Sequence, residues 1–196
     1  ATQSSDDFET STKDQECAIG YNRGYEWAHA ARNSILIAIF ATLIATTLGT
    51  LAAVGLSRPQ MPYRKPIMAL LISPLIVPII IIAAGMFFFY SHIGLAYTHL
   101  GVILAHAVMG TPYVVITVTA TLIGFDETLI RASASLGAKP LRTFFRVIMP
   151  LITPGVISGA LFAFITSFDE VVLIYFLADA EQKTIPIQML SLIHIS

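Results

Sequence analysis

The sequence predicts an all-α bundle of membrane-spanning helices. Hydrophobic residues make up 56% of the 196 positions and charged residues only 12%, against about 25% charged residues in an ordinary soluble domain. The mean hydropathy is +0.77, and apolar runs of about 20 residues, the length that crosses a hydrocarbon core, recur along the chain. The net charge of -1 offers no basic surface for nucleic acid. We therefore expect contact with membrane lipid and no nucleic-acid partner.

The chain divides into a polar first part and an apolar remainder. Residues 1–30 are polar and acidic, with too few apolar side chains to bury a core, and we expect an extracytoplasmic segment there. Residues 31–189 are expected to form one transmembrane domain. Residues 190–196 read like the translation of a sequencing adapter and are expected to be a non-native tail. The four predicted spans are apolar runs that cover residues 34–56, 67–90, 99–123 and 151–178.

Basic residues gather in the two loops on one side of these spans. One loop is the proline-rich turn after the first span, and the other is the longer loop at 124–150. Basic residues in short loops stay in the cytoplasm, so both loops are predicted to be cytoplasmic and both chain ends to lie outside. The basic residues of the two loops are Arg58, Arg64, Lys65, Arg131, Lys139, Arg142 and Arg146.

The loop at 124–150 carries the signals of two short helices. Asp126 can cap the first helix, and Gly137 stands where a left-handed residue would end it. Pro140 prevents the helix from resuming in line, and a second short helix is expected to end at Pro150, which can open the next span. Two interpretations fit this pattern equally: a pair of interfacial helices under the bilayer, or a docking element whose small side chains let another protein approach closely.

A family resemblance favours docking. The run "RASASLGAKPLRTFFRVIMPLITPG" resembles the cytoplasmic loop of ATP-binding-cassette (ABC) importer permeases of the type I, or MetI-like, fold class, the binding-protein-dependent inner-membrane components. The resemblance implies a coupling helix that sits in a groove of an ATP-binding subunit. Arg131 stands where the family usually has glutamate, so the contact expected of that glutamate is in question. The coupling residues implied by the match are Arg131, Ala132, Ser133, Leu136, Gly137, Ala138 and Pro150.

The resemblance continues toward the end of the chain. "GALFAFITSFDEVVLIYFLA" and "TIPIQM" look like the spermidine/putrescine permease subfamily, whose subunits have six spans. By that comparison this chain is a piece without the first and last spans, located in the bacterial inner membrane. The implied partners are cytoplasmic ATP-binding subunits, a second homologous permease subunit, a periplasmic substrate-binding protein and a small-molecule cargo, expected to be a polyamine. The implied role is transport without catalysis or cofactor.

Three residues are candidates for the cargo path. Asp169 and Glu170 are the only acids within an otherwise apolar run, and a helix from Pro150 would place them roughly 28 Å along a core of about 30 Å, near the outer mouth. They are either a solvated pair at a helix end or a pair that attracts a polycation. Tyr113 could offer its ring face to an ammonium group, although a packing role explains it as well.

Other classes of protein remain as alternatives. The same transporter class could carry iron, thiamine or a phosphonate, and a membrane-embedded enzyme using His106 or Asp169 or a structural subunit without a pore is also conceivable. The sequence has no "GxxxxGK[ST]" and no "HExxH" run, so nucleotide hydrolysis and metalloprotease chemistry have no residues to perform them. His99 and His106 share a helix face, but without a third ligand they make no convincing metal site.

Overall fold

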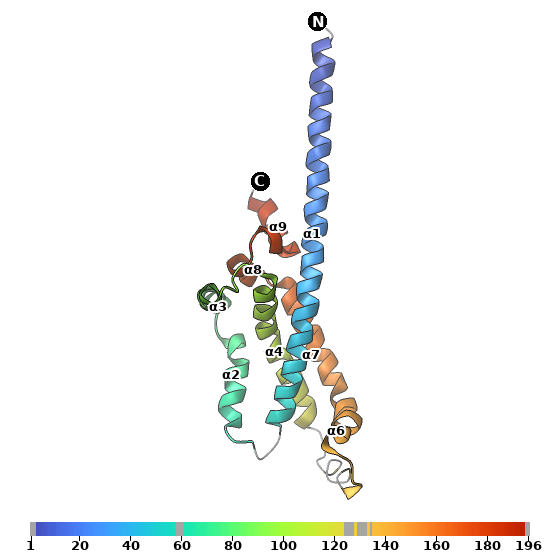
Figure 1. Ribbon diagram of the computed structural model, residues 1–196, viewed down its shortest axis with the longest axis vertical. Coiled ribbons are helices and arrows are strands. Elements are labelled where there is room, and N and C mark those ends of the chain that lie inside the picture. The colour runs from blue at the N-terminus through green and yellow to red at the C-terminus, as the bar shows by residue number, and fades with distance from the viewer. Residues whose placement is uncertain (1–2, 58–60, 124–127, 129–132, 134, 195–196) are drawn as a thin grey trace.

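The computed structural model describes residues 3–57, 61–123, 128, 133 and 135–194, and within these ranges the chain is helical and has no strand. This confirms the predicted all-α class (Figure 1). The elements are α1 (Gln3–Leu56), α2 (Arg64–Ile76), α3 (Ile79–Ile93), α4 (His99–Ile123), α6 (Pro140–Thr143), the π-helical turn η1 (Phe144–Ile148), α7 (Met149–Asp169), α8 (Val172–Leu177), the 3-10 turn η2 (Ala180–Gln182) and α9 (Ile185–His194).

Helices α1, α4 and α7 form the centre of the bundle, and each packs against the other two (Figure 1). By length and composition, three helical stretches of the described chain can cross a membrane: Gly24–Leu56, His99–Ile123 and Phe144–Asp169. Among them α4 is buried most, because it lies between the others. The predicted span at 99–123 is therefore confirmed to the residue, and the predicted first span is part of the longer helix α1.

Small residues allow the three helices to approach closely. Ala45 of α1 and Ala163 of α7 both lie against Gly110 of α4. A side chain built on Gly159 would place its Cβ 2.8 Å from the Cα of Val114 and 2.5 Å from Oγ1 of Thr117. Lipid tails are as apolar as the helix surfaces, so the hydrophobic effect does not drive helices together in a membrane. Close packing at small residues stabilises their association instead. Gly110 and Gly159 therefore allow α4 to pack closely against its neighbours.

Gly159→Ala is expected to destabilise the bundle, whereas Gly85→Ala is not. The added methyl group at 159 meets backbone that cannot move aside, while nothing lies within 4 Å of a Cβ at Gly85. Overpacking of this kind costs about 1–3 kcal/mol. Thermal unfolding of both variants in detergent measures the difference, and equal melting temperatures would show that α4 and α7 are not packed as described.

The predicted second span, 67–90, is wrong as a single helix. It is broken into α2 and α3, whose axes differ in direction by 106°. Pro78 has no amide hydrogen and forces the preceding residue out of the helical region, and Val77 accordingly has φ -77° and ψ 135°. As a result α2 runs along the bundle, and α3 lies across it beside α8 (Figure 1).

The predicted fourth span, 151–178, is also wrong at its outer end. Helix α7 ends at Asp169, and Glu170 is extended, with φ -74° and ψ 121°. The short helix α8 then begins at Val172. Glu170 interrupts the run because its carboxylate binds the first amides of α8, which gives the chain a second helix start in place of a continuous helix.

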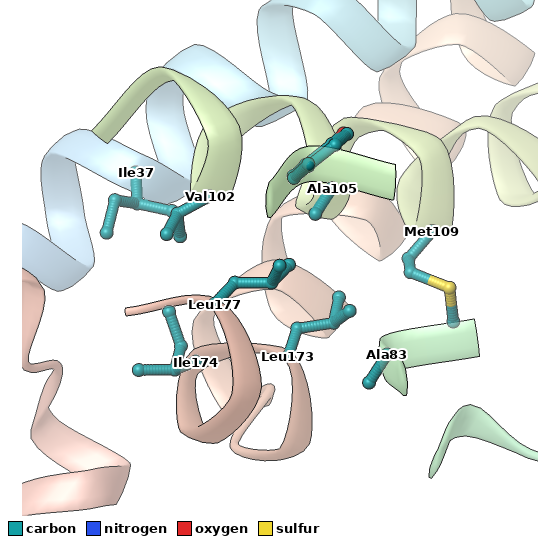
Figure 2. Close-up of a cluster of buried hydrophobic side chains, with 9 residues drawn as sticks. Ile37, Ala83, Val102, Ala105, Met109, Leu173, Ile174 and Leu177 are labelled. Carbon is teal, nitrogen blue, oxygen red and sulfur yellow. The ribbon is translucent and has the colours of Figure 1, made fainter. Parts of the chain in front are cut away.

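Apolar side chains of α8 fix the position of this second helix. Leu173, Ile174 and Leu177 are all buried and point toward Val102 and Ala105 of α4, with residues of α1 and α3 around them (Figure 2). Burial of such side chains contributes about 1.5–3 kcal/mol each relative to an exposed position. The break between α7 and α8 is therefore held in place on the α8 side by this buried cluster.

The last part of the described chain is hydrogen-bonded to the middle of α1. The Asn33 side-chain amide donates hydrogen bonds to the carbonyls of Glu181 and Lys183, at 2.7 and 3.2 Å, and the Ser34 hydroxyl accepts one from the amide of Ile185 at 2.9 Å. Helix α1 also continues upward through the expected extracytoplasmic segment, away from the bundle (Figure 1). Helix α9 continues to His194 and so includes residue 190, where the non-native tail is expected to begin. That residues 190–196 are non-native stays a prediction.

Candidate functional site

The first helix of the 124–150 loop ends as the sequence predicts, at a bend around Gly137 and Ala138 that we call the elbow. Gly137 has φ +74°, and the amide of Ala138 donates to the carbonyl of Ser133 at 3.1 Å. This six-residue closure is a Schellman motif, which needs a left-handed residue at the position of Gly137. A Cβ at Gly137 would meet nothing within 4 Å, so glycine is favoured here by backbone conformation and not by packing.

The exposed part of the elbow is its tip. Leu136 is 87% exposed, and Gly137 is exposed beside it, while Ala138 is half-buried. Ser133 instead is buried, and its hydroxyl lies 3.0 Å from that of Thr143, which joins the two arms of the elbow. Of the residues expected to dock, the structure thus exposes Leu136 and turns Ser133 inward. Asp126, Arg131 and Ala132 lie outside the described residues.

The second arm of the elbow is the helix that begins at Pro140. The sequence predicts that this helix ends at Pro150, and this prediction is wrong. Pro140 to Asp169 is continuous helix, in which the turn from Phe144 to Ile148 is π-helical. Pro150 is exposed near the start of α7 and has no amide hydrogen to donate. The wider turn accommodates the proline, because the amide of Met149 reaches back five residues to the carbonyl of Phe144. The second arm of the elbow is therefore a helical extension of α7.

The two acids that the sequence singled out, Asp169 and Glu170, lie at the break after α7. Asp169 is the exposed last residue of α7, at the end of the bundle opposite the elbow (Figure 1). Glu170 is half-buried, and its Oε1 accepts hydrogen bonds from the amides of Val172 at 2.8 Å and Leu173 at 3.3 Å. The two carboxylates differ in role: Glu170 caps α8, and Asp169 is presented at the surface.

A third residue, His106, lies at this break, although the sequence does not place it there. His106 of α4 is 1% exposed, and its Nδ1 lies 3.1 Å from the carbonyl oxygen of Ser167 and 2.9 Å from the Ser167 hydroxyl. The signal available in the sequence was a histidine within an apolar span, since such a residue must find a polar partner. Its partner could not be identified, because α4 and α7 are far apart along the chain.

The electrostatics of the break favour a positive charge. The last turn of a helix carries carbonyl groups without intrahelical partners and a partial negative charge, to which Asp169 adds a full one. The opposite, positive end of α8 faces the carboxylate of Glu170 and is offset by it. Discontinuous helices use such ends to bind ions of the opposite sign in membrane transporters. The arrangement is suited to an ammonium group.

The remaining candidates lie elsewhere. Tyr113 is half-buried in the middle of α4, where its ring stacks on Phe162 at 6.3 Å between centroids. Phe162 precedes Asp169 by seven residues, or about 10 Å along α7, so Tyr113 does not join the acids at the break. His99 is exposed whereas His106 is buried. Over the described part of the chain, no group of three or more histidine, cysteine or acidic residues could hold a metal ion.

The described chain is a helical bundle with two breaks, one between α2 and α3 and one between α7 and α8, and with the elbow at one end. Its fold is similar to that in a crystal structure of a bacterial ABC transporter involved in the import of the acidic polysaccharide alginate. The TM-score is 0.69 at 19% sequence identity, over 84% of this chain and 57% of that one. Residues 45–192 match the family described as binding-protein-dependent transport system inner membrane component. The chain belongs to this family, a family of multi-pass inner-membrane permeases.

Several curated relatives are similar over most of the described chain. The spermidine/putrescine transport system permease protein PotC of Haemophilus influenzae is 31% identical over 84% of this chain and 64% of its own length. The putrescine transport system permease protein PotI of Escherichia coli is 32% identical over 81% and 59%. The osmoprotective compounds uptake permease protein GgtD of a Synechocystis strain is 32% identical over 82% and 55%. The chain thus spans 55% to 64% of the length of these relatives.

Proposed function

We propose that this chain is the membrane subunit of an ABC importer and that its cargo is a polyamine such as spermidine or putrescine. Family membership supports the class of transporter. Percentage identity does not separate the cargoes, because the polyamine and osmoprotectant permeases are equally similar to this chain. The observation that favours a polyamine is the broken helix, where the exposed carboxylate of Asp169 stands at the negative end of α7.

The other parts of the importer follow from the same proposal. A periplasmic binding protein delivers the cargo at the end of the bundle where Asp169 lies, and a second homologous permease subunit completes the path. ATP is hydrolysed by separate cytoplasmic subunits. These receive the exposed tip of the elbow, Leu136 and Gly137, in a groove. Because the elbow continues into α7 without interruption, a push on its tip is transmitted along that helix to the break after Asp169.

Charge at the break also ranks the alternative cargoes. A phosphonate is an anion and would be repelled by Asp169, whereas thiamine and iron are cations that the same end could accept. An enzyme built on His106 has less support, since the Nδ1 of this histidine is already engaged with Ser167. A structural subunit has less support as well, because residues 45–192 match a family of transport-system components.

A cargo panel tests the proposal. The full-length permease, assembled with its partner subunits in proteoliposomes, is supplied with the binding protein, ATP and one of four compounds: spermidine, thiamine, a ferric chelate or a phosphonate. We expect stimulated ATP hydrolysis and uptake with spermidine, and no uptake of the phosphonate. Uptake of thiamine or iron without spermidine would replace the polyamine by that cargo, and hydrolysis without any uptake would contradict the transport role.

A further inference from the structure

The end of α7 leaves a carbonyl that needs a partner. In a continuous helix the carbonyl of Ser167 would accept a hydrogen bond from the amide four residues on, that of Val171. The chain leaves the helix at Glu170, so this bond is not made. Ser167 is only 7% exposed, and a buried carbonyl without a partner is costly inside a membrane, where water cannot replace the lost bond. Some other donor must satisfy it.

His106 supplies that donor from the neighbouring helix. Its Nδ1 is 3.1 Å from the Ser167 carbonyl oxygen, and a carbonyl can only accept, so we assign the imidazole proton to Nδ1. The Ser167 hydroxyl, 2.9 Å from the same nitrogen, is close enough to share the proton. His106 is itself held in the most buried helix of the bundle. The end of α7 is thus fixed to α4 by the contact of the His106 side chain with Ser167.

Both sides of the break are therefore capped by side chains. His106 binds the last turn of α7 two residues before Asp169, and Glu170 binds the first amides of α8 directly after it. Asp169 is the residue between these two fixed points. The two caps restrict the position of its backbone, while its own side chain is exposed and makes neither of these contacts.

We propose that His106 is a positioning residue for cargo passage: by capping α7 it sets the place at which Asp169 meets the cation. This inference rests on the proposed function for the role of Asp169, while the contact itself stands on the described distances. A histidine that only filled space in the bundle would affect the stability of the subunit but would act independently of Asp169. The two roles predict different results when both residues are changed together.

The test is a double-mutant cycle in the assembled full-length transporter, read as the spermidine concentration for half-maximal uptake. His106→Leu is expected to raise this concentration about five- to tenfold, as for a lost hydrogen bond. His106→Asn, whose amide places a donor where Nδ1 stands, is expected to restore it. In an Asp169→Asn background, His106→Leu should add no further change. Multiplicative effects of the two substitutions, or failure of asparagine to restore uptake, would overturn the positioning role.

A second measurement does not depend on the cargo. Hydrogen exchange of the amides from Val171 to Ile174 should be faster in His106→Leu than in the unchanged protein, and unaffected in His106→Asn. Thr119→Val is the matched control, because Thr119 is a buried polar residue of the same helix, away from the break. Unchanged exchange in His106→Leu would overturn the inference. If Asp169→Asn alone leaves uptake unaltered, the proposed function is contradicted and the inference about His106 is not. The hydrogen-exchange comparison then still decides whether His106 caps α7, because it does not depend on the cargo.

Discussion

Gly137→Pro is expected to abolish the coupling of cargo to ATP hydrolysis in the assembled transporter. Gly137 has φ +74°, and proline is fixed near -65°, so the Schellman closure between Ala138 and Ser133 cannot form. The tip of the elbow would then no longer lie where the two arms, joined through Ser133 and Thr143, present it. ATP hydrolysis should become insensitive to the loaded binding protein, and uptake should fall to background.

Gly137→Asn is the matched control for this prediction. Asparagine adds a side chain but enters the left-handed region at small cost, and nothing lies within 4 Å of a Cβ at this position. It should therefore retain most of the coupling. Cargo-stimulated ATP hydrolysis, measured with amounts of assembled complex matched between variants, separates the two substitutions. Full coupling in the proline variant would show that the elbow does not transmit the signal.

Asp169→Lys is expected to eliminate uptake of a polyamine, and Asp169→Asn to reduce it by about tenfold or more, the range for a hydrogen bond to a charged group. The lysine places a positive charge at the end of α7, where the helix and the carboxylate now favour a cation. The asparagine keeps size and polarity and removes only the charge. Uptake of radiolabelled spermidine at several ionic strengths measures both effects, and added salt should shrink the difference.

Two controls distinguish the charge of Asp169 from the shape of the break. Glu170→Gln retains an oxygen that can accept from Val172 and Leu173, so it should preserve the break and reduce uptake far less. Glu181→Gln removes an exposed acid elsewhere on the outer part of the chain and should leave uptake unaltered. If all three amide variants behaved alike, cargo passage would not depend on the position of Asp169.

The sequence predicts well what depends on hydropathy and local conformation. The span at 99–123 is found with its predicted bounds because one uninterrupted apolar run supports one helix. The left-handed Gly137 is found because the end of a short helix followed by Pro140 leaves few other conformations for a glycine. The family resemblance seen in this same loop and in the run around Asp169 is confirmed by the match of residues 45–192 to the family.

What the sequence does not predict depends on contacts between distant segments. The bend at Val77 and Pro78 could have remained a modest kink, and its angle of 106° follows from the packing of α3 against α8. Likewise aspartate and glutamate are compatible with a helix, so these residue types alone do not show that α7 ends at Asp169. The end is stabilised locally by Glu170, which binds the amides of α8, and from a distance by His106, which binds Ser167 from another helix. Only the second contact joins distant segments, and it is not visible from spacing.

The most direct test is a cryo-electron microscopy map of the full-length permease, assembled with its partner subunits and binding protein and trapped with spermidine. We expect an ammonium group of the cargo within hydrogen-bond distance of the Asp169 carboxylate, and Leu136 and Gly137 seated in a groove of an ATP-binding subunit. Cargo bound away from the break after α7, with the elbow tip free of the ATP-binding subunit, would contradict it.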